Sequence, residues 1–388
     1  MKETRTPINF LTGGTGLLGS HIGAELLRRG QKTFFLIRSK NKTSAGERLK
    51  KVLTWHGIAH QLKSKAYLVE GDLAALDPLT LRTELPQIHR VIHCASETSF
   101  AERHRRSVWR TNVEHLQRLL NFVGRKRIPA FFHISTAYAV GRKAGRCPEE
   151  PLESRNFFNG YEESKAAAEA MLLERCFKEG IRLTILRPSI VYGHSRTGRT
   201  YRFNALYYPI KTALFLKKIF LEDIRQRDGL KAAEAGVYLR PDGRIHLPLR
   251  INVGKTGGVN LIPVDFFVKA FFAITEDAFE GGIYHIVNSQ QTRIAAIIDY
   301  AQEQFGLHGI DECSEQIFQR TAHNSLERLF ERYLEAYSPY MKDQRRFTTK
   351  KADPILQRNG LRCPPFDAAM CRRSMAFAAQ NDWSGLSM

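Results

Sequence analysis

Three glycines between an apolar strand and an amphipathic helix constrain the fold of this chain most. In "INFLTGGTGLLGSHIGAELLRRG" (8–30), Gly13, Gly16 and Gly19 follow the apolar run and open the helical pattern. Glycine permits a tight turn and lets backbone N–H groups approach a phosphate, and a helix N-terminus favours the phosphate charge. The stretch predicts a strand, turn and helix that cradle the pyrophosphate of a dinucleotide; a merely structural glycine turn is the alternative.

Short apolar runs alternate with helical patterns through the first half of the chain. Strands are expected at 8–13, 32–38, 66–72, 90–96, 130–135 and 182–189, and helices near 17–29, 44–57, 105–123 and 161–179. Near-continuous apolar strands are typical of a parallel sheet covered by helices on both faces. The predicted fold class is α/β, a Rossmann-like doubly wound parallel sheet.

The alternation stops after about residue 193, which suggests two parts. We expect an NAD(P)-binding domain over 1–193, its sheet completed by segments near 250–290, and a smaller, mostly helical substrate-binding part over 194–388. Within the second part we expect a strand at 282–289 and helices near 292–305 and 314–336. The basic final fifty residues have no assigned role.

The segment "YRFNALYYPIKTALFLKKIF" (201–220) mixes aromatic, aliphatic and basic residues. It could be a packing helix, a lid over an apolar substrate, or a helix in peripheral contact with a membrane surface.

The net charge of +20 is the unusual bulk property. It favours acidic partners, such as polyphosphate ligands or acidic proteins. The basic clusters lie in no recognisable nucleic-acid module, so we expect no nucleic-acid partner. No apolar stretch is long enough to span a bilayer, and the six scattered cysteines suggest reduced thiols rather than disulfides or a metal site. We expect a cytoplasmic protein, either a monomer or a homodimer.

The end of the second expected strand carries positive charge. Arg38 and Lys40 stand where an acidic residue would hydrogen-bond the ribose of NAD, whereas an arginine suits the 2′-phosphate of NADP. NADPH is therefore favoured over NADH as the cofactor. The alternative is that both are ordinary solvated charges.

A tyrosine and a lysine lie four residues apart at the start of an alanine-rich helix. In "NGYEESKAAAEAM" (159–171), Tyr161 and Lys165 share one side of the helix, so an ammonium could stabilise a phenolate and lower the phenol's pKa. This spacing also occurs by chance in many helices. The motifs around it favour a catalytic pair.

Those motifs resemble the extended short-chain dehydrogenase/reductase superfamily, in the order in which its members carry them. They are "TGGTGLLG", "EGDL", "HCAS", the asparagine of "RTNVEHLQRLL", "FFHISTAYAVG", "YEESK" and "LRPSIVYG". The resemblance implies that Tyr161 is the general acid, that Lys165 holds the ribose and lowers the tyrosine pKa, and that Thr136 orients the substrate carbonyl.

The resemblance also implies two sets of binding residues. The cofactor set is Thr12, Gly13, Thr15, Gly16, Leu17, Leu18, Gly19, Arg38, Lys40, Asp72, Leu73, Cys94, Ala95, Ser96, Asn112, Ser135, Tyr161, Lys165, Pro188, Ser189, Ile190 and Val191. The substrate set is Thr98, Thr136, Ala137 and Tyr138. His93 and His133 are expected to be buried packing residues, and Cys94 to be unreactive.

Within the superfamily, "STAYAVG", "NLIPVDFFVKA" and "FLIRSK" followed by "AGERLKKVL" look like fatty acyl reductases and thioester reductase domains. This implies NADPH-dependent reduction of an acyl thioester, on coenzyme A or an acidic carrier protein, to an aldehyde or alcohol. Three alternatives stay open: a sugar-nucleotide epimerase or dehydratase, a hydroxysteroid-type dehydrogenase, and a non-catalytic dinucleotide sensor.

Overall fold

The computed structural model describes residues 6–77, 84–153, 155–255 and 257–385. Its largest sheet has seven parallel strands in the order β13-β7-β5-β4-β1-β2-β3. Their bounds are β1 Asn9–Thr12, β2 Thr33–Ile37, β3 Ala66–Glu70, β4 Arg90–His93, β5 Ala130–Ile134, β7 Arg182–Pro188 and β13 Gly282–Ile286. The predicted Rossmann-like doubly wound sheet is confirmed. Its strand order reverses between β1 and β4, and folds of this class bind ligands at that point.

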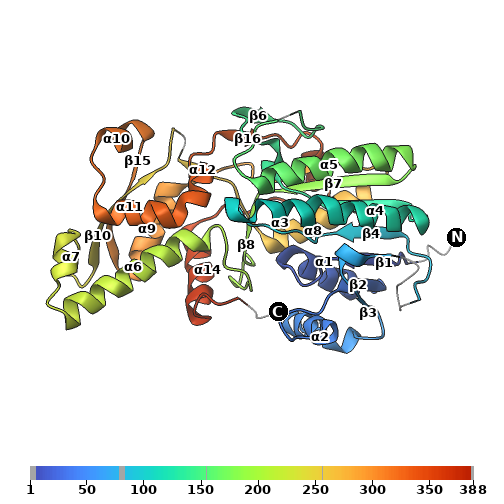
Figure 1. Cartoon of the computed structure of the whole chain (residues 1–388), viewed down its shortest axis with the longest axis horizontal. Coiled ribbons are helices and arrows are strands. Elements are labelled where there is room, and N and C mark those ends of the chain that lie inside the picture. The colour runs from blue at the N-terminus through green and yellow to red at the C-terminus, as the bar shows by residue number, and fades with distance from the viewer. Residues whose placement is uncertain (1–5, 78–83, 154, 256, 386–388) are drawn as a thin grey trace.

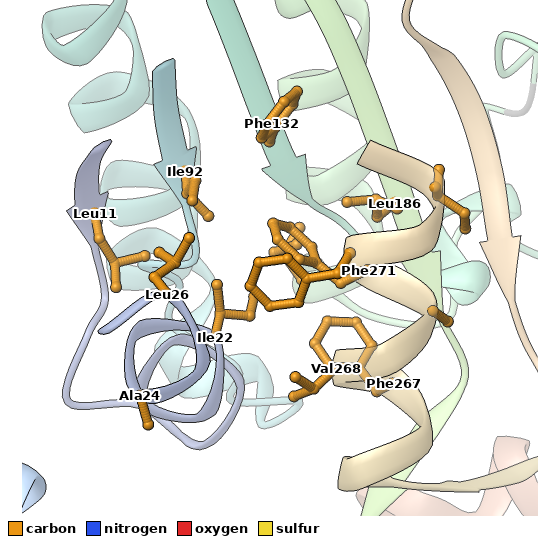
Figure 2. Packing of buried hydrophobic residues seen from close by; sticks show 14 of the residues in the cluster. Leu11, Ile22, Ala24, Leu26, Ile92, Phe132, Leu186, Phe267, Val268 and Phe271 are labelled. Atoms are coloured by element: carbon orange, nitrogen blue, oxygen red, sulfur yellow. The ribbon is translucent and has the colours of Figure 1, made fainter. Parts of the chain in front are cut away.

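Helices cover both faces of this sheet, in agreement with the apolar character of its strands. On one face lie α1 (Leu17–Arg28), α2 (Ala45–Trp55), α8 (Val264–Asp277) and α13 (Ala352–Arg358). Figure 2 shows Phe267 and Phe271 of α8 directed toward Ile22 of α1 across the ends of the strands. The other face carries α4 (His115–Arg125) and α5 (Gly160–Lys178).

A second group of elements lies beside the large sheet, on the left in Figure 1. Strands β9 (Tyr238–Leu239), β10 (Ile245–Asn252) and β15 (Leu307–Cys313) form a small sheet. Around it lie α6 (Tyr207–Gln226), α7 (Leu230–Glu234), α9 (Ile294–Phe305), α10 (Glu315–Arg320) and α11 (Ser325–Leu334). Buried side chains of this sheet and of α6, α9 and α11 form a separate hydrophobic core.

The last fifty residues return to the large sheet. They contain α12 (Ser338–Met341), β16 (Arg345–Phe347), α13 and α14 (Ala368–Gln380). Strand β16 pairs in parallel with β6 (Gly145–Cys147), and Ile355 and Leu356 of α13 join the core under the large sheet. The division at residue 193 stays a prediction, although segments after that residue clearly contribute to both groups of elements.

Two helices differ from the sequence-based expectation. The helix expected at 314–336 is divided into α10 and α11, because Asn324 caps a new helix and forms a capping box with Glu327. The helix expected at 105–123 begins as α3 (Arg105–Trp109), passes through a π-helical turn over Arg110–Glu114, and continues as α4.

Helix α6 corresponds to the mixed 201–220 segment. It buries Leu216 in the small-sheet core and exposes Phe215 and Ile219. Within the part of the chain that the structure describes, no helix has both the length and the apolar character needed to cross a bilayer.

Candidate active site

A cavity of about 660 Å³ opens at the carboxyl ends of the parallel strands. The loops after β1, β4, β5 and β7 meet there, because parallel strands all end at the same edge of the sheet. All the site residues predicted from the sequence line this cavity except Asn112 and Ala137. The structure therefore brings residues from across 180 positions of sequence, from Thr12 to Val191, into one site.

The glycine-rich loop packs tightly against the loop after β4. Gly13 has a positive φ of 71°, and a Cβ there would overlap the backbone amide of Ala95. A Cβ on Gly19 would overlap the carbonyl oxygen of Gly13. Tyr201 braces the loop from the second group of elements, since its hydroxyl donates to the Gly16 carbonyl at 2.6 Å and contacts Ser20. This geometry fits the cradle that a dinucleotide pyrophosphate requires.

Positive charge gathers at the end of the cavity beyond β2. Arg38 Nη1 donates to Asp72 Oδ2 at 2.8 Å, and the hydrogen bonds from the Ala74 amide and from Arg38 lower the Asp72 pKa despite its burial. Lys40 and Arg202 also line this end. A phosphate monoester is the kind of group that such a cluster binds.

Arg48 belongs to the same cluster and was missed by the sequence-based prediction. Its guanidinium donates to the Arg38 carbonyl at 2.5 Å and to Thr15 Oγ1 at 3.1 Å, while its buried Nε has no hydrogen-bond partner. The signal was present in "AGERLKKVL". Arg48 is a charged residue on the face of α2 that also buries Ala45, Leu49 and Val52, so its charge needs a partner on the inside.

Tyr161, Thr136 and Lys165 meet on one wall of the cavity. Asn159 caps α5, its Oδ1 accepting from the Glu162 amide at 3.0 Å, and this fixes Tyr161 in the first turn. The side chain of Thr136 lies close enough to the Tyr161 phenol to act on its pKa. Lys165 Nζ, one turn further on, donates to the Ile134 carbonyl at 2.8 Å.

The electrostatics of this wall differ from the sequence-based expectation. Burial raises the pKa of Tyr161 above its ordinary value, and the nearby side chain of Thr136 only partly opposes this. Burial also lowers the pKa of Lys165 to about 8, against the opposing charge of Glu169. In the structure, therefore, burial rather than the lysine charge dominates the phenol's pKa, and the phenol is protonated at neutral pH.

Ser135 faces a buried ion pair beneath the site. Its hydroxyl donates to Glu169, and Arg187 donates to the same carboxylate from Nη2 at 2.5 Å. The side chains of Arg187 and Glu169 are 0% and 1% exposed, so each charge depends on the other. The Ser135 hydroxyl therefore belongs to the buried hydrogen-bond network around Glu169, although Ser135 still lines the cavity.

Asn112 lies behind the cavity and joins two of its walls. Its Oδ1 accepts from the Glu97 amide at 2.8 Å, and its Nδ2 donates to Ser164 Oγ at 2.9 Å. Asn112, which lies in the π-helical turn, thus ties the loop after β4 to α5. Ala137, the other predicted residue outside the lining, is fully buried.

The two histidines behave as predicted, as neutral packing residues. His93 Nδ1 shares a hydrogen bond of 2.7 Å with Thr12 Oγ1, and burial lowers its pKa to about 3. Burial likewise lowers the His133 pKa well below its ordinary value and raises that of the Cys94 thiol to about 12. None of the three is charged at neutral pH.

Aromatic residues from the end of the chain cover the tyrosine side of the cavity. Phe100 lies 5.5 Å from the Tyr161 ring and stacks on Tyr340 at 4.9 Å, between ring centroids. Tyr340 in turn accepts a hydrogen bond from Asn159, the cap of α5, at 2.8 Å. Neither Phe100 nor Tyr340 was predicted. The position of Tyr340 depends on where the last part of the chain folds, whereas Phe100 lies in the loop after β4, two residues beyond the predicted Thr98.

Comparison with known proteins points to one family. The sequence model of the family described as "Male sterility protein" matches residues 11–271. A nonribosomal peptide synthetase of Cladobotryum is 28% identical over 210 residues, covering 49% of this chain and 20% of that protein. The L-2-aminoadipate reductase large subunit of Eremothecium gossypii is 29% identical over 215 residues, covering 49% of this chain and 15% of the subunit. The chain thus matches a fifth or less of the length of these relatives.

Among solved structures, the terminal R domain from the myxalamid PKS-NRPS biosynthetic pathway superposes with a TM-score of 0.73. The match covers 97% of this chain and 92% of that domain at 23% identity, which establishes a shared fold.

Proposed function

This chain belongs to the male sterility protein family, whose members are NAD(P)-dependent oxidoreductases of the extended short-chain dehydrogenase/reductase type, and we propose that it reduces an acyl thioester with NADPH. The observation that carries the proposal is that Tyr161, Thr136 and Lys165 line one cavity together with the glycine-rich loop. The product is an aldehyde, or an alcohol if reduction continues.

Tyr161 is the proton donor in this proposal. Because burial keeps its phenol protonated at neutral pH, Tyr161 has a proton to give as negative charge develops on the carbonyl oxygen. Thr136 orients that oxygen, and Lys165 supplies a positive charge beside the developing anion. Loss of the thiol from the reduced carbon then gives the aldehyde.

NADPH rather than NADH is proposed as the cofactor, and it would supply the hydride. Gly13, Gly16 and Gly19 would hold its pyrophosphate, and Lys165 the ribose beside the nicotinamide. Arg38 and Arg48 would hold the 2′-phosphate, which would give the unpartnered Nε of Arg48 an acceptor.

The thioester is proposed to be carried by coenzyme A or by an acidic carrier protein. The net charge of +20 supports a polyanionic carrier. The names of the relatives support the same chemistry, since one is a nonribosomal peptide synthetase and another a carboxylic-acid reductase.

The direct test is a substrate panel with purified protein. Loss of NADPH absorbance should accompany formation of aldehyde or alcohol when an acyl-coenzyme A thioester is added. UDP-sugars and hydroxysteroids with oxidised cofactor serve as the contrast. Turnover of one of these with none of any thioester would overturn the proposal.

A further inference from the structure

The outer side of α6 and α11 carries large apolar side chains that stay exposed. Phe215 and Ile219, one turn apart on α6, are 49% and 41% exposed. Leu329 and Tyr333, one turn apart on α11, are 38% and 43% exposed. The rings of Phe215 and Tyr333 meet edge to face with their centroids 6.3 Å apart, so the two pairs adjoin where the helices contact each other (Figure 1). We call these four side chains, with the cations beside them, the α6–α11 face.

The cations of this face have no acidic partner. They are the exposed basic residues of the two helices, Lys211, Lys218, Arg225, Arg328 and Arg332. Residues three, four or seven positions apart share one side of a helix, so these cations flank the apolar residues. Among the residues that the structure describes, no carboxylate pairs with any of the five, and Lys211 and Arg328 donate to backbone carbonyls instead. Glu222 and Glu331, the exposed acids of these helices, each have a basic partner of their own.

The combination of charge and apolar surface narrows the choice of partner. Single exposed apolar residues are ordinary, but a contiguous patch of them marks an interaction surface. A second copy of this chain fits poorly, because a two-fold dimer would set each face against its own image and bring five unpaired cations against five. Apolar side chains set among lysines and arginines are what an interfacial helix presents to an anionic bilayer.

We propose that the α6–α11 face docks on an anionic phospholipid bilayer, with its apolar side chains among the acyl chains of the lipid and its cations at the phosphates. This is one of the roles that the sequence leaves open for residues 201–220, and it does not depend on the proposed reaction. The opposite side of the same helices borders the cavity through Ala213 and Phe330. A docked bilayer would therefore lie roughly one helix diameter from the active-site cavity.

Vesicle binding by the full chain is the first test. Wild type should sediment with vesicles of equal parts phosphatidylcholine and phosphatidylserine, and much less with pure phosphatidylcholine, because the cations need anionic headgroups. Added salt should weaken this binding. A wild-type protein that ignores both kinds of vesicle would refute the proposal and leave the face to an acidic protein partner.

A matched charge reversal separates docking from general attraction, since the net charge of +20 alone favours an anionic surface. Lys211→Glu with Lys218→Glu should lower the affinity for phosphatidylserine vesicles at least about tenfold, because each cation beside the lipid contributes several-fold. Lys50→Glu with Lys51→Glu reverses two exposed lysines of α2 and should have a much smaller effect. Equal losses from the two pairs would show general attraction only and overturn the proposal.

Removing apolar side chains tests insertion at constant charge. Phe215→Ser with Ile219→Ser should lower the affinity for the same vesicles at least about tenfold. Phe177→Ser with Phe279→Ser removes two exposed rings from elsewhere on the molecule and should leave the affinity unchanged. Unchanged binding by the α6 variant would refute insertion. Light scattering tests the remaining occupant, since a wild-type dimer that the α6 variant converts to a monomer would make the face a dimer contact and overturn the proposal.

Discussion

Burial shifts the pKa values of Tyr161 and Lys165, the two ionisable groups on one wall of the cavity, in opposite directions. It raises the pKa of the Tyr161 phenol and lowers that of the Lys165 ammonium to about 8. Both shifts favour the uncharged form, as desolvation always does. At neutral pH the phenol keeps its proton and the lysine is still mostly charged, which is the state that carbonyl reduction requires.

The Lys165 pKa predicts an alkaline limit to activity. Because the lysine loses its charge as pH rises through about 8, kcat/KM for reduction should fall above that pH. An arginine at this position keeps its charge at high pH. Any activity that Lys165→Arg retains should therefore not fall in the same pH range. A wild-type profile that stays flat well above pH 8 would contradict the assigned role of Lys165.

Arg48 should help to select the cofactor. Arg48→Met removes a buried guanidinium beside Thr15, and losing charged hydrogen bonds of about 1.5–3 kcal/mol should weaken NADPH binding roughly ten- to a hundredfold. NADH affinity should change little. Lys50→Met, which removes an exposed charge from the same helix, is the control. Equal losses for the two cofactors would show that Arg48 supports the loop only.

At the scale of elements, the last part of the chain holds α5, the helix that carries Tyr161 and Lys165, from outside the large sheet. Arg345 of β16 is fully buried and donates from Nη1 to Glu162 at 3.0 Å and from Nε to Asp343 at 2.7 Å. Its guanidinium carbon also lies 4.7 Å from the Tyr138 ring. Since Glu162 follows Tyr161 directly, this cluster fixes the first turn of α5.

Breaking the cluster should impair catalysis more than cofactor binding. Arg345→Met removes the buried guanidinium that pairs with Glu162, which should lower the unfolding free energy by about 3–5 kcal/mol. We expect kcat to fall at least tenfold at temperatures where the variant remains folded, with NADPH affinity nearly unchanged. Arg346→Met alters the exposed neighbour and is the matched control. Wild-type kcat in a folded Arg345→Met protein would remove this positioning role.

At the scale of the whole molecule, the excess of 59 basic over 39 acidic residues should act on charged substrates. Salt screens such attraction, so KM for an acyl-coenzyme A should rise severalfold between low and high ionic strength. The N-acetylcysteamine thioester of the same acid lacks phosphates and should show little change. The same salt dependence for both thioesters would show that the charge serves another purpose.

The sequence alone predicted the large sheet and most of its cavity, because both depend on local patterns. Buried parallel strands read as apolar runs, and the loops at their carboxyl ends necessarily meet. The contacts of Tyr340 and Arg345 could not be predicted in this way. They depend on the pairing of β6 with β16, two three-residue strands about 200 positions apart with no periodicity to detect.

Some of the features that the sequence-based prediction missed do have a recognisable local sequence pattern. Asn324 with Glu327 is a helix-start pattern inside the segment expected to be one long helix. Arg48 was visible as a charge on an apolar helix face. The part of the cavity lined by Ala213, Ala301 and Phe330 had no such signal, since these residues come from three separate elements and look like ordinary core residues in the sequence.

The most direct measurement is NADPH-dependent reduction of an acyl-coenzyme A by wild type and by Tyr161→Phe, with NADPH affinity determined for both. Wild type should form aldehyde or alcohol, and Tyr161→Phe should lose at least about a hundredfold in kcat, the lower end of the usual contribution of general acid catalysis, while binding NADPH normally. A Tyr161→Phe protein that keeps most of the wild-type rate would contradict the account.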